Sequence, residues 1–190
     1  MRGIYIQEPY KIEAKEINIP LRNPGETLIE VLACGICGTD LKIFKGQTLA
    51  TYPLIPGHEI VGKVVESEEL EKGMLVTIDP NKPCGRCDNC RKGKMNLCEN
   101  LSAVGVTRNG GFSELLSVDD SLVYSLAPDT SIKTAVFAEP LSCIVDGFNV
   151  SDFGYVSDVA VIGGGPIAVS YTHLRAHETP EHLVCRLLLE

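Results

Sequence analysis

The sequence predicts a mainly β chain with some helix, in which a barrel-like β domain precedes the first strand and turn of an α/β domain. Two observations favour this arrangement. Up to about residue 125, short segments rich in Val, Ile and Thr alternate with Gly/Pro turns, as in strands joined by tight connections. From about residue 131 the apolar residues take helical spacing, and an apolar strand-like segment then enters a glycine-rich turn.

Three segments have the clearest strand composition: residues 27–33 (TLIEVLA), 60–67 (IVGKVVES) and 74–79 (MLVTID). Their β-branched residues suit a pleated, half-buried sheet. The turn signals in this part of the chain are NPGE, PGHE and EKG. Because many short strands separated by such turns are typical of closed β architectures, we expect a barrel.

The second half of the chain changes character. Residues 131–150 have helical spacing, and Pro140 suits the first position of a second helix. Residues 159–162 are expected to form a buried strand that leads into the glycine-rich turn. We therefore divide the chain into three parts: a β domain over 1–157, the start of an α/β domain over 158–169 and an unrelated tail over 170–190.

Composition excludes several classes of function. The formal charge is −8 and the basic run at 91–94 is short, so we expect no nucleic-acid partner and interpret the run as a solvated loop. The N-terminus lacks the apolar segment of a signal peptide, and no stretch approaches 18 apolar residues. We therefore expect a cytoplasmic chain with no membrane partner.

Four cysteines follow the spacing C-x2-C-x2-C-x7-C: Cys84, Cys87, Cys90 and Cys98. Thiolates that are closely spaced on one loop can surround a tetrahedral Zn²⁺ ion with little chain strain. Disulfides and free thiols are the alternatives, but a reducing compartment favours metal. The spacing therefore predicts a structural zinc site.

A second set of possible ligands combines Cys37, His58 and Glu59. His58 is the only histidine in the first 170 residues. A single histidine in a loop is more often structural, but sulfur, nitrogen and oxygen donors with one position left open are what a catalytic zinc requires. Together with Cys37, we interpret His58 as a metal ligand.

The segment GGGPIA over residues 163–168 fits the pattern G-x-G-x-x-G/A. Gly163 would make the tight turn, Gly165 would let a pyrophosphate approach the backbone, and Ala168 would keep the helix close to the strand. With Pro166 between them, these residues are predicted to line a dinucleotide site. The motif alone is weak evidence, and the preceding strand-like segment strengthens it.

The chain contains six motifs in a fixed order: CGICGTD, PGHEIVG, the four-cysteine loop, GGFSE, AEPLSC and VIGGGPIA. With these motifs, residues 1–168 resemble the zinc-dependent medium-chain dehydrogenase/reductase family. The sorbitol and polyol dehydrogenase branch is the most similar. The resemblance implies a GroES-like β-barrel followed by a truncated Rossmann domain. It also implies two zinc ions, one catalytic and one structural, with NAD or NADP bound by a full-length homo-oligomer that oxidises an alcohol or polyol.

The resemblance also assigns roles to single residues. Cys37 and His58 match catalytic-zinc ligands, and Glu59 matches a glutamate that binds zinc directly in the polyol branch. Glu139 matches the remaining metal-site position, directly or through water. The alternative for Glu139 is a carboxylate that stabilises a helix N-terminus.

Two further residues match the proton path of the family. Thr39 matches the hydroxyl that passes the substrate proton outward, and Asp40 matches a carboxylate that orients His58. Cys34 and Cys143 match no ligand and are interpreted as packed residues.

The chain as given is expected to be inactive, because most of the cofactor site would lie beyond residue 169. A non-catalytic zinc-binding interaction module is an alternative, but it would need only the four-cysteine loop and has no use for an open site at Cys37, His58 and Glu59. A third alternative is a threonine or sugar-acid dehydrogenase on the same scaffold.

The residues from about 170 onward are predicted to be foreign to the native gene. The family pattern stops within three residues of the glycine-rich turn, and three of the four histidines, His173, His177 and His182, follow it. A histidine-rich metal tract is the alternative. The final VCRLLLE is also encoded by GTATGCCGTCTTCTGCTTGAA, which resembles a sequencing-library adapter. Resequencing the source locus across codon 169 should give different codons after it; the same codons in uninterrupted genomic DNA would contradict the prediction.

Overall fold

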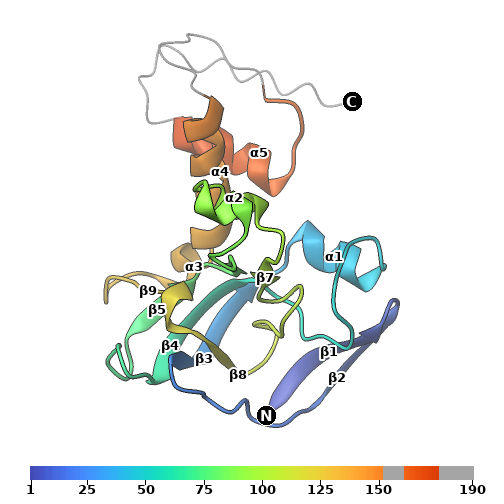
Figure 1. Ribbon diagram of the computed structural model, residues 1–190, viewed down its shortest axis with the longest axis vertical. Helices are drawn as coiled ribbons and strands as arrows, with labels where there is room; N and C mark the ends of the chain where they lie inside the picture. The colour runs from blue at the N-terminus through green and yellow to red at the C-terminus, as the bar shows by residue number, and fades with distance from the viewer. Residues whose placement is uncertain (152–160, 176–190) are drawn as a thin grey trace. The chain divides into compact units, whose positions relative to one another are not determined.

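The computed structural model describes residues 1–151 and 161–175. The chain divides into two compact units, Met1–Glu139 and Pro140–Glu190. The first unit is built on a five-stranded antiparallel sheet with the strand order β8-β3-β4-β5-β9 (Figure 1). Its strands are β3 (Glu26–Gly35), β4 (Glu59–Glu66), β5 (Leu75–Ile78), β8 (Leu115–Asp119) and β9 (Val123–Ser125). The three strands expected from β-branched composition are therefore confirmed.

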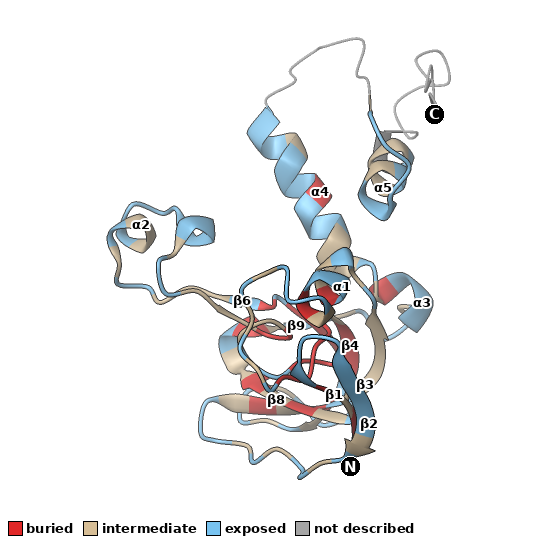
Figure 2. Ribbon diagram, turned by 90° about the vertical axis from the view of Figure 1, so that its right-hand side faces the viewer, coloured by how far each residue is buried: buried red, intermediate tan, exposed pale blue. Residues whose placement is uncertain are grey.

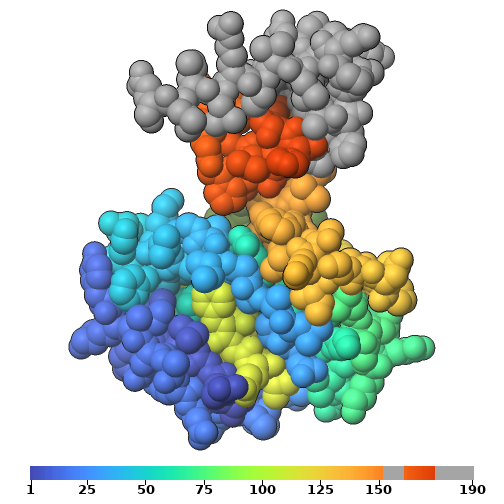
Figure 3. All heavy atoms as spheres, turned by 180° about the vertical axis from the view of Figure 1, so that it is seen from behind, coloured from blue at the N-terminus to red at the C-terminus, as the bar shows by residue number. Residues whose placement is uncertain are grey.

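An N-terminal hairpin of β1 (Arg2–Glu8) and β2 (Lys11–Glu16) is tied by backbone hydrogen bonds to the segments that precede β4 and β8. The Ile6 and Leu54 N–H groups each donate to the carbonyl of the other, at 2.8 and 2.9 Å, and the Ile4 N–H donates to the Phe112 carbonyl at 2.7 Å. Figure 3 shows the segment around β8, in yellow, between the dark-blue N-terminus and the lighter blue of β3. Residues 110–119 thus connect the hairpin to the main sheet.

A short ribbon of β6 (Asn81–Lys82) and β7 (Ser102–Ala103) carries the four-cysteine lobe, which projects away from the barrel (Figure 2). The helices are α1 (Gly38–Phe44), α2 (Asp88–Arg91), α3 (Ile132–Ala135), α4 (Ala138–Ser151) and α5 (Pro166–Arg175), with 3-10 turns η1 (Met95–Leu97) and η2 (Asp120–Leu122). None of these helices has the length and apolar character that a membrane span requires in the part of the chain that the structure describes.

Two clusters of buried apolar residues hold the first unit together. The larger one lies on the main sheet and includes Ile29 and Val76, both 0% exposed. The smaller one joins Ile6 of β1, Ile43 of α1 and Leu54 of the loop before β4. Because α1 follows Cys37 and the Leu54 loop leads to His58, the smaller cluster anchors both segments that carry the predicted metal ligands.

The region after Glu139 differs from the expectation in two places. Helix α4 begins at Ala138, so Pro140 lies inside its first turn, where a missing N–H breaks no hydrogen bond. Of the strand expected over 159–162, residues 159 and 160 lie outside the described residues, and Val161 and Ile162 are not in a strand. A strand needs a neighbour to pair with, and the described residues of this unit supply none.

We expect Ile29→Ala to lower the free energy of unfolding by about 2–5 kcal/mol, because it leaves a cavity at the centre of the larger cluster. Leu21→Ala is the matched control, since Leu21 is 86% exposed and its substitution should change stability by about 0.5 kcal/mol or less. Urea unfolding of both variants measures the difference. Equal stability of the two variants would show that the cluster is not the core.

Candidate metal sites

Cys37 is placed by the N-terminus of helix α1. It is the N-cap residue, with extended backbone angles (φ −96°, ψ 159°). Its N–H donates to Oδ2 of Asp40 at 2.8 Å, and the Asp40 N–H donates back to the Cys37 carbonyl at 3.1 Å. This reciprocal cap fixes the first turn of the helix and therefore the direction of the Cys37 thiol.

The same carboxylate holds the loop that carries His58. Oδ1 of Asp40 accepts a hydrogen bond from the Gly57 N–H at 3.2 Å and lies 3.6 Å from Nδ1 of His58. Both side chains are buried, and Nδ1 of His58 has no hydrogen-bond partner. Asp40 therefore links the Cys37 turn to the His58 loop through two backbone hydrogen bonds.

Three glycines pack against the backbone of Gly57, which has a φ of +94°. A Cβ atom on Gly105 or Gly110 would lie 2.4 or 2.1 Å from the Gly57 carbonyl oxygen. The Gly111 N–H donates to the same oxygen at 2.8 Å. Gly110, the first residue of the GGFSE segment, thus allows a close backbone approach beside His58.

The three predicted ligands converge on one point. Cys37, His58 and Glu59 each offer a donor atom, and these atoms all lie within 4.8 Å of one another. This spacing lets one ion with bonds of about 2.0–2.3 Å contact all three after small side-chain adjustments. Burial alone would lower the pKa of His58, but Asp40 and Cys37 beside it outweigh burial and raise the pKa to about 9. The site therefore favours a positive charge, which a metal ion would supply.

Of the other predicted site residues, Thr39 lies beside the ligand group and Glu139 does not belong to it. Oγ1 of Thr39 lies 3.8 Å from the Cys37 sulfur, so the predicted relay hydroxyl adjoins the cluster. Glu139 is half-buried in the first turn of α4, and the structure does not bring it into the ligand group. Its position fits the alternative interpretation, in which a carboxylate stabilises a helix N-terminus.

Cys34 and Cys143, which match no ligand, are unlike each other. Burial raises the pKa of the Cys34 thiol to about 12, and the carboxylates of Asp40 and Glu59 add to the effect. Cys34 therefore stays protonated, as expected of a packed residue. Cys143 is exposed on α4, so its interpretation as a packed residue is wrong.

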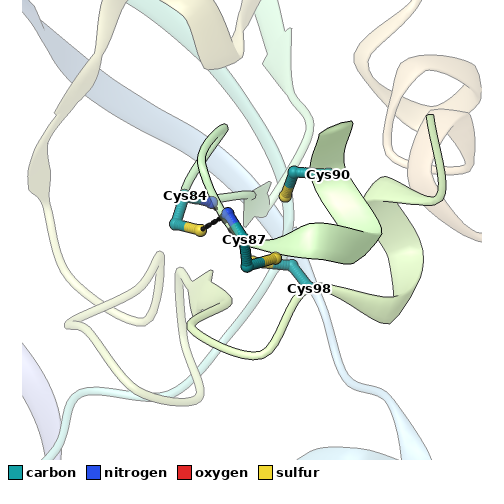
Figure 4. Close-up of side chains that lie close together, drawn as sticks. All are labelled: Cys84, Cys87, Cys90 and Cys98. Carbon is teal, nitrogen blue, oxygen red and sulfur yellow. Dashed lines mark hydrogen bonds between the residues drawn. The ribbon is translucent and has the colours of Figure 1, made fainter. Parts of the chain in front are cut away.

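The four cysteines of the lobe also converge. Their sulfur atoms lie within 4.8 Å of one another and turn toward a shared centre in Figure 4. The Cys87 N–H donates to Cys84 Sγ at 3.4 Å, and the Cys84 and Asn100 N–H groups donate to Cys98 Sγ at 3.2 and 3.4 Å. Such donors stabilise thiolates.

The cysteine thiols of the lobe differ in their pKa values, and a bound cation would favour the ionised form of all four. The backbone N–H groups of Arg86 and Cys87 lower the pKa of Cys84 to about 6. Burial and the neighbouring sulfurs raise the pKa of Cys90 to about 12. Four adjacent thiols cannot all ionise without a positive charge among them, and a Zn²⁺ ion would supply that charge.

The lobe has no apolar core of its own. No residue between Pro83 and Asn100 belongs to the buried apolar set, and Met95 and Leu97 are 56% and 57% exposed. Figure 2, where buried residues are red, shows none in the lobe. A metal ion bound by the four sulfur atoms would therefore supply the stability that an apolar core gives elsewhere.

The predicted dinucleotide residues form a turn that enters a helix. Gly163 has a φ of +123°, which glycine adopts without strain. Pro166 is the first residue of α5, and Ala168 is half-buried within it. The glycine-rich turn and its helix are thus present, whereas Val161 and Ile162, directly before Gly163, are not in a strand.

Comparison with known proteins identifies the family. A model of the alcohol dehydrogenase GroES-like domain matches residues 23–128, more than half of the chain. The chain therefore belongs to this family, and both the resemblance to zinc-dependent medium-chain dehydrogenases and the GroES-like fold class are confirmed.

The chain spans about half the length of the relatives it matches. It is 34% identical to D-arabinitol dehydrogenase 1 of Uromyces fabae, over 92% of this chain and 51% of that protein. It is 35% identical to D-altritol 5-dehydrogenase of Agrobacterium fabrum, over 89% and 53%. A solved structure of a Sinorhizobium meliloti 1021 protein, bound to NADP, superposes with a TM-score of 0.89 at 35% identity, covering 92% of this chain and 52% of that one.

We expect purified protein to contain about two zinc equivalents and Cys87→Ser to contain about one, because the two ligand sets share no residue. The variant should also lose solubility, since the lobe has no substitute core. Cys143→Ser, at an exposed cysteine outside both sets, is the matched control and should keep both equivalents. Metal analysis by mass spectrometry is the measurement, and two equivalents in Cys87→Ser would contradict the lobe assignment.

Proposed function

We propose that the whole protein is a zinc-dependent oxidoreductase that transfers a hydride from an alcohol or polyol CH–OH group to NAD⁺ or NADP⁺. The observation that carries the proposal is the convergence of Cys37, His58 and Glu59. A thiolate, an imidazole and a carboxylate leave one tetrahedral position open, which a purely structural zinc does not need. The sugar-alcohol dehydrogenases among its relatives support a polyol as the substrate.

The residues of this chain have distinct roles in the proposed reaction. A zinc ion held by Cys37, His58 and Glu59 would act as a Lewis acid that lowers the pKa of the substrate hydroxyl. Thr39, beside the Cys37 sulfur, would accept the hydroxyl proton and pass it outward. Asp40 keeps the Cys37 turn and the His58 loop in register through its two backbone hydrogen bonds.

The cofactor would bind at the glycine-rich turn, where Gly163, Gly165, Pro166 and Ala168 precede or begin helix α5. Backbone N–H groups at a helix N-terminus attract a pyrophosphate. The NADP in the Sinorhizobium meliloti structure supports a nicotinamide cofactor. One turn supplies only part of such a site, so we propose that the present chain is inactive and that the full-length protein is an active cytoplasmic homo-oligomer.

Two other functions are less well supported. A non-catalytic zinc-binding module would use the four-cysteine lobe alone, and it leaves the group at Cys37 unexplained. A threonine or sugar-acid dehydrogenase would use the same two metal sites with a different substrate pocket, so assays with these substrates separate it from a polyol dehydrogenase.

We expect no alcohol-dependent reduction of NAD⁺ or NADP⁺ by this chain and clear turnover by a version extended to the length of its relatives. In the extended protein, His58→Ala should abolish turnover by removing a ligand. Thr39→Ala should lower kcat by roughly 10²–10⁴-fold, the usual effect of losing a proton-transfer group. Thr134→Ala, at an exposed threonine of α3, is the control. Absorbance of the reduced nicotinamide measures the rate, and near-normal turnover by Thr39→Ala would exclude the relay role.

A further inference from the structure

Gly35 lies directly opposite Glu59 where strands β3 and β4 pair. A Cβ atom on residue 35 would lie 1.9 Å from Oε2 of Glu59 and 3.0 Å from its Cβ. The Glu59 carboxylate therefore occupies the space that a side chain at position 35 would fill. The same side chain offers the oxygen that lies within 4.8 Å of the Cys37 and His58 donor atoms.

We propose that Gly35 is a positioning residue for this metal site, because the missing side chain lets Glu59 turn its carboxylate toward Cys37 and His58. The inference rests on the proposed metal role of that group. Gly35 is not among the residues with positive φ, so alanine can adopt its backbone conformation. The need for glycine at this position comes from the Glu59 side chain.

At other glycines of the same sheet and loop, the backbone itself opposes an added side chain. A Cβ on Gly62 would lie 2.5 Å from the Glu30 carbonyl oxygen, which belongs to the paired backbone and cannot move aside. Gly57 has a φ of +94°, which strains any other residue. At Gly35 the closest obstructing atom is the end of a flexible side chain. Alanine there would displace the carboxylate from the group, and the 3.0 Å approach to the Glu59 Cβ would require only a small further adjustment of the paired strands.

The charge of the carboxylate explains why its position matters. A Cys37 thiolate and a neutral His58 would supply one negative charge to a divalent ion, and Glu59 supplies the second. Without Glu59 the ligands of this half-buried site would balance only one of the two positive charges, which is costly away from bulk water. Displacing the carboxylate should therefore weaken metal binding and change the ligand field.

The test is a Co²⁺ titration of the full chain after the four-cysteine lobe has been saturated with Zn²⁺. The visible absorption of bound Co²⁺ reports both affinity and ligand geometry. Gly35→Ala should weaken Co²⁺ binding by at least about tenfold, as substitutions around metal ligands do, and should alter the spectrum. Gly38→Ala is the matched control, because Gly38 is next to Cys37 in the chain but its Cβ would meet nothing within 4 Å.

A double-variant comparison isolates the contact. In a Glu59→Ala background, Gly35→Ala should change Co²⁺ affinity by less than about twofold, because the displaced carboxylate is already absent. If Gly35→Ala does not fold alone, which thermal unfolding detects, the Gly35→Ala/Glu59→Ala protein should fold. Failure of both to fold would place the conflict in the backbone and overturn the inference.

Two outcomes of the titration overturn the inference in distinguishable ways. Unchanged Co²⁺ affinity and spectrum in Gly35→Ala, when the unsubstituted chain binds the ion, would overturn the role of Gly35 alone. Absence of the Co²⁺ signal from the unsubstituted chain would overturn the proposed metal role of Cys37, His58 and Glu59 together with it.

Discussion

The carboxylate of Asp40 is the interaction on which the candidate catalytic centre depends. It accepts hydrogen bonds from the backbone N–H groups of Cys37 and Gly57 and faces the His58 ring. Two of these contacts cross between segments that are far apart in sequence, and the carboxylate is 5% exposed. A buried anion is tolerated only where such donors surround it, so the helix N-terminus and the histidine loop are fixed by the same group.

The first unit is stabilised in two different ways. In the barrel, apolar residues such as Ile29 and Val76 are fully buried, and their removal from water is the main source of stability. In the lobe, the four sulfur atoms approach one another without apolar support. The candidate catalytic group lies in the barrel part, where strand pairing and the small cluster around Ile43 already hold its ligands close together.

Local signals in the sequence predicted the strands and the lobe, because β-branched composition, turn residues and cysteine spacing act over a few positions. The meeting of Cys37 with His58 was predicted from the ligand chemistry of the two residues and supported by the resemblance, since their separation gives no local signal. The packing of Gly110 on Gly57 was not predicted. A glycine in the sequence shows that a side chain is missing, but it does not show which segment of backbone packs against it. The strand expected over 159–162 could not be predicted from its own residues, since a strand forms only where a neighbouring strand pairs with it.

The paired strands β6 and β7 hold the two ends of the lobe side by side, with Asn81 opposite Ala103 and Lys82 opposite Ser102. In topological terms the lobe is an insertion whose entry and exit coincide. Its length can therefore change without altering the path of the barrel, because lengthening a loop whose ends are fixed adds little entropy cost. The lobe is consequently a part of this domain where additions to the chain would be tolerated, provided that the four sulfur positions are kept.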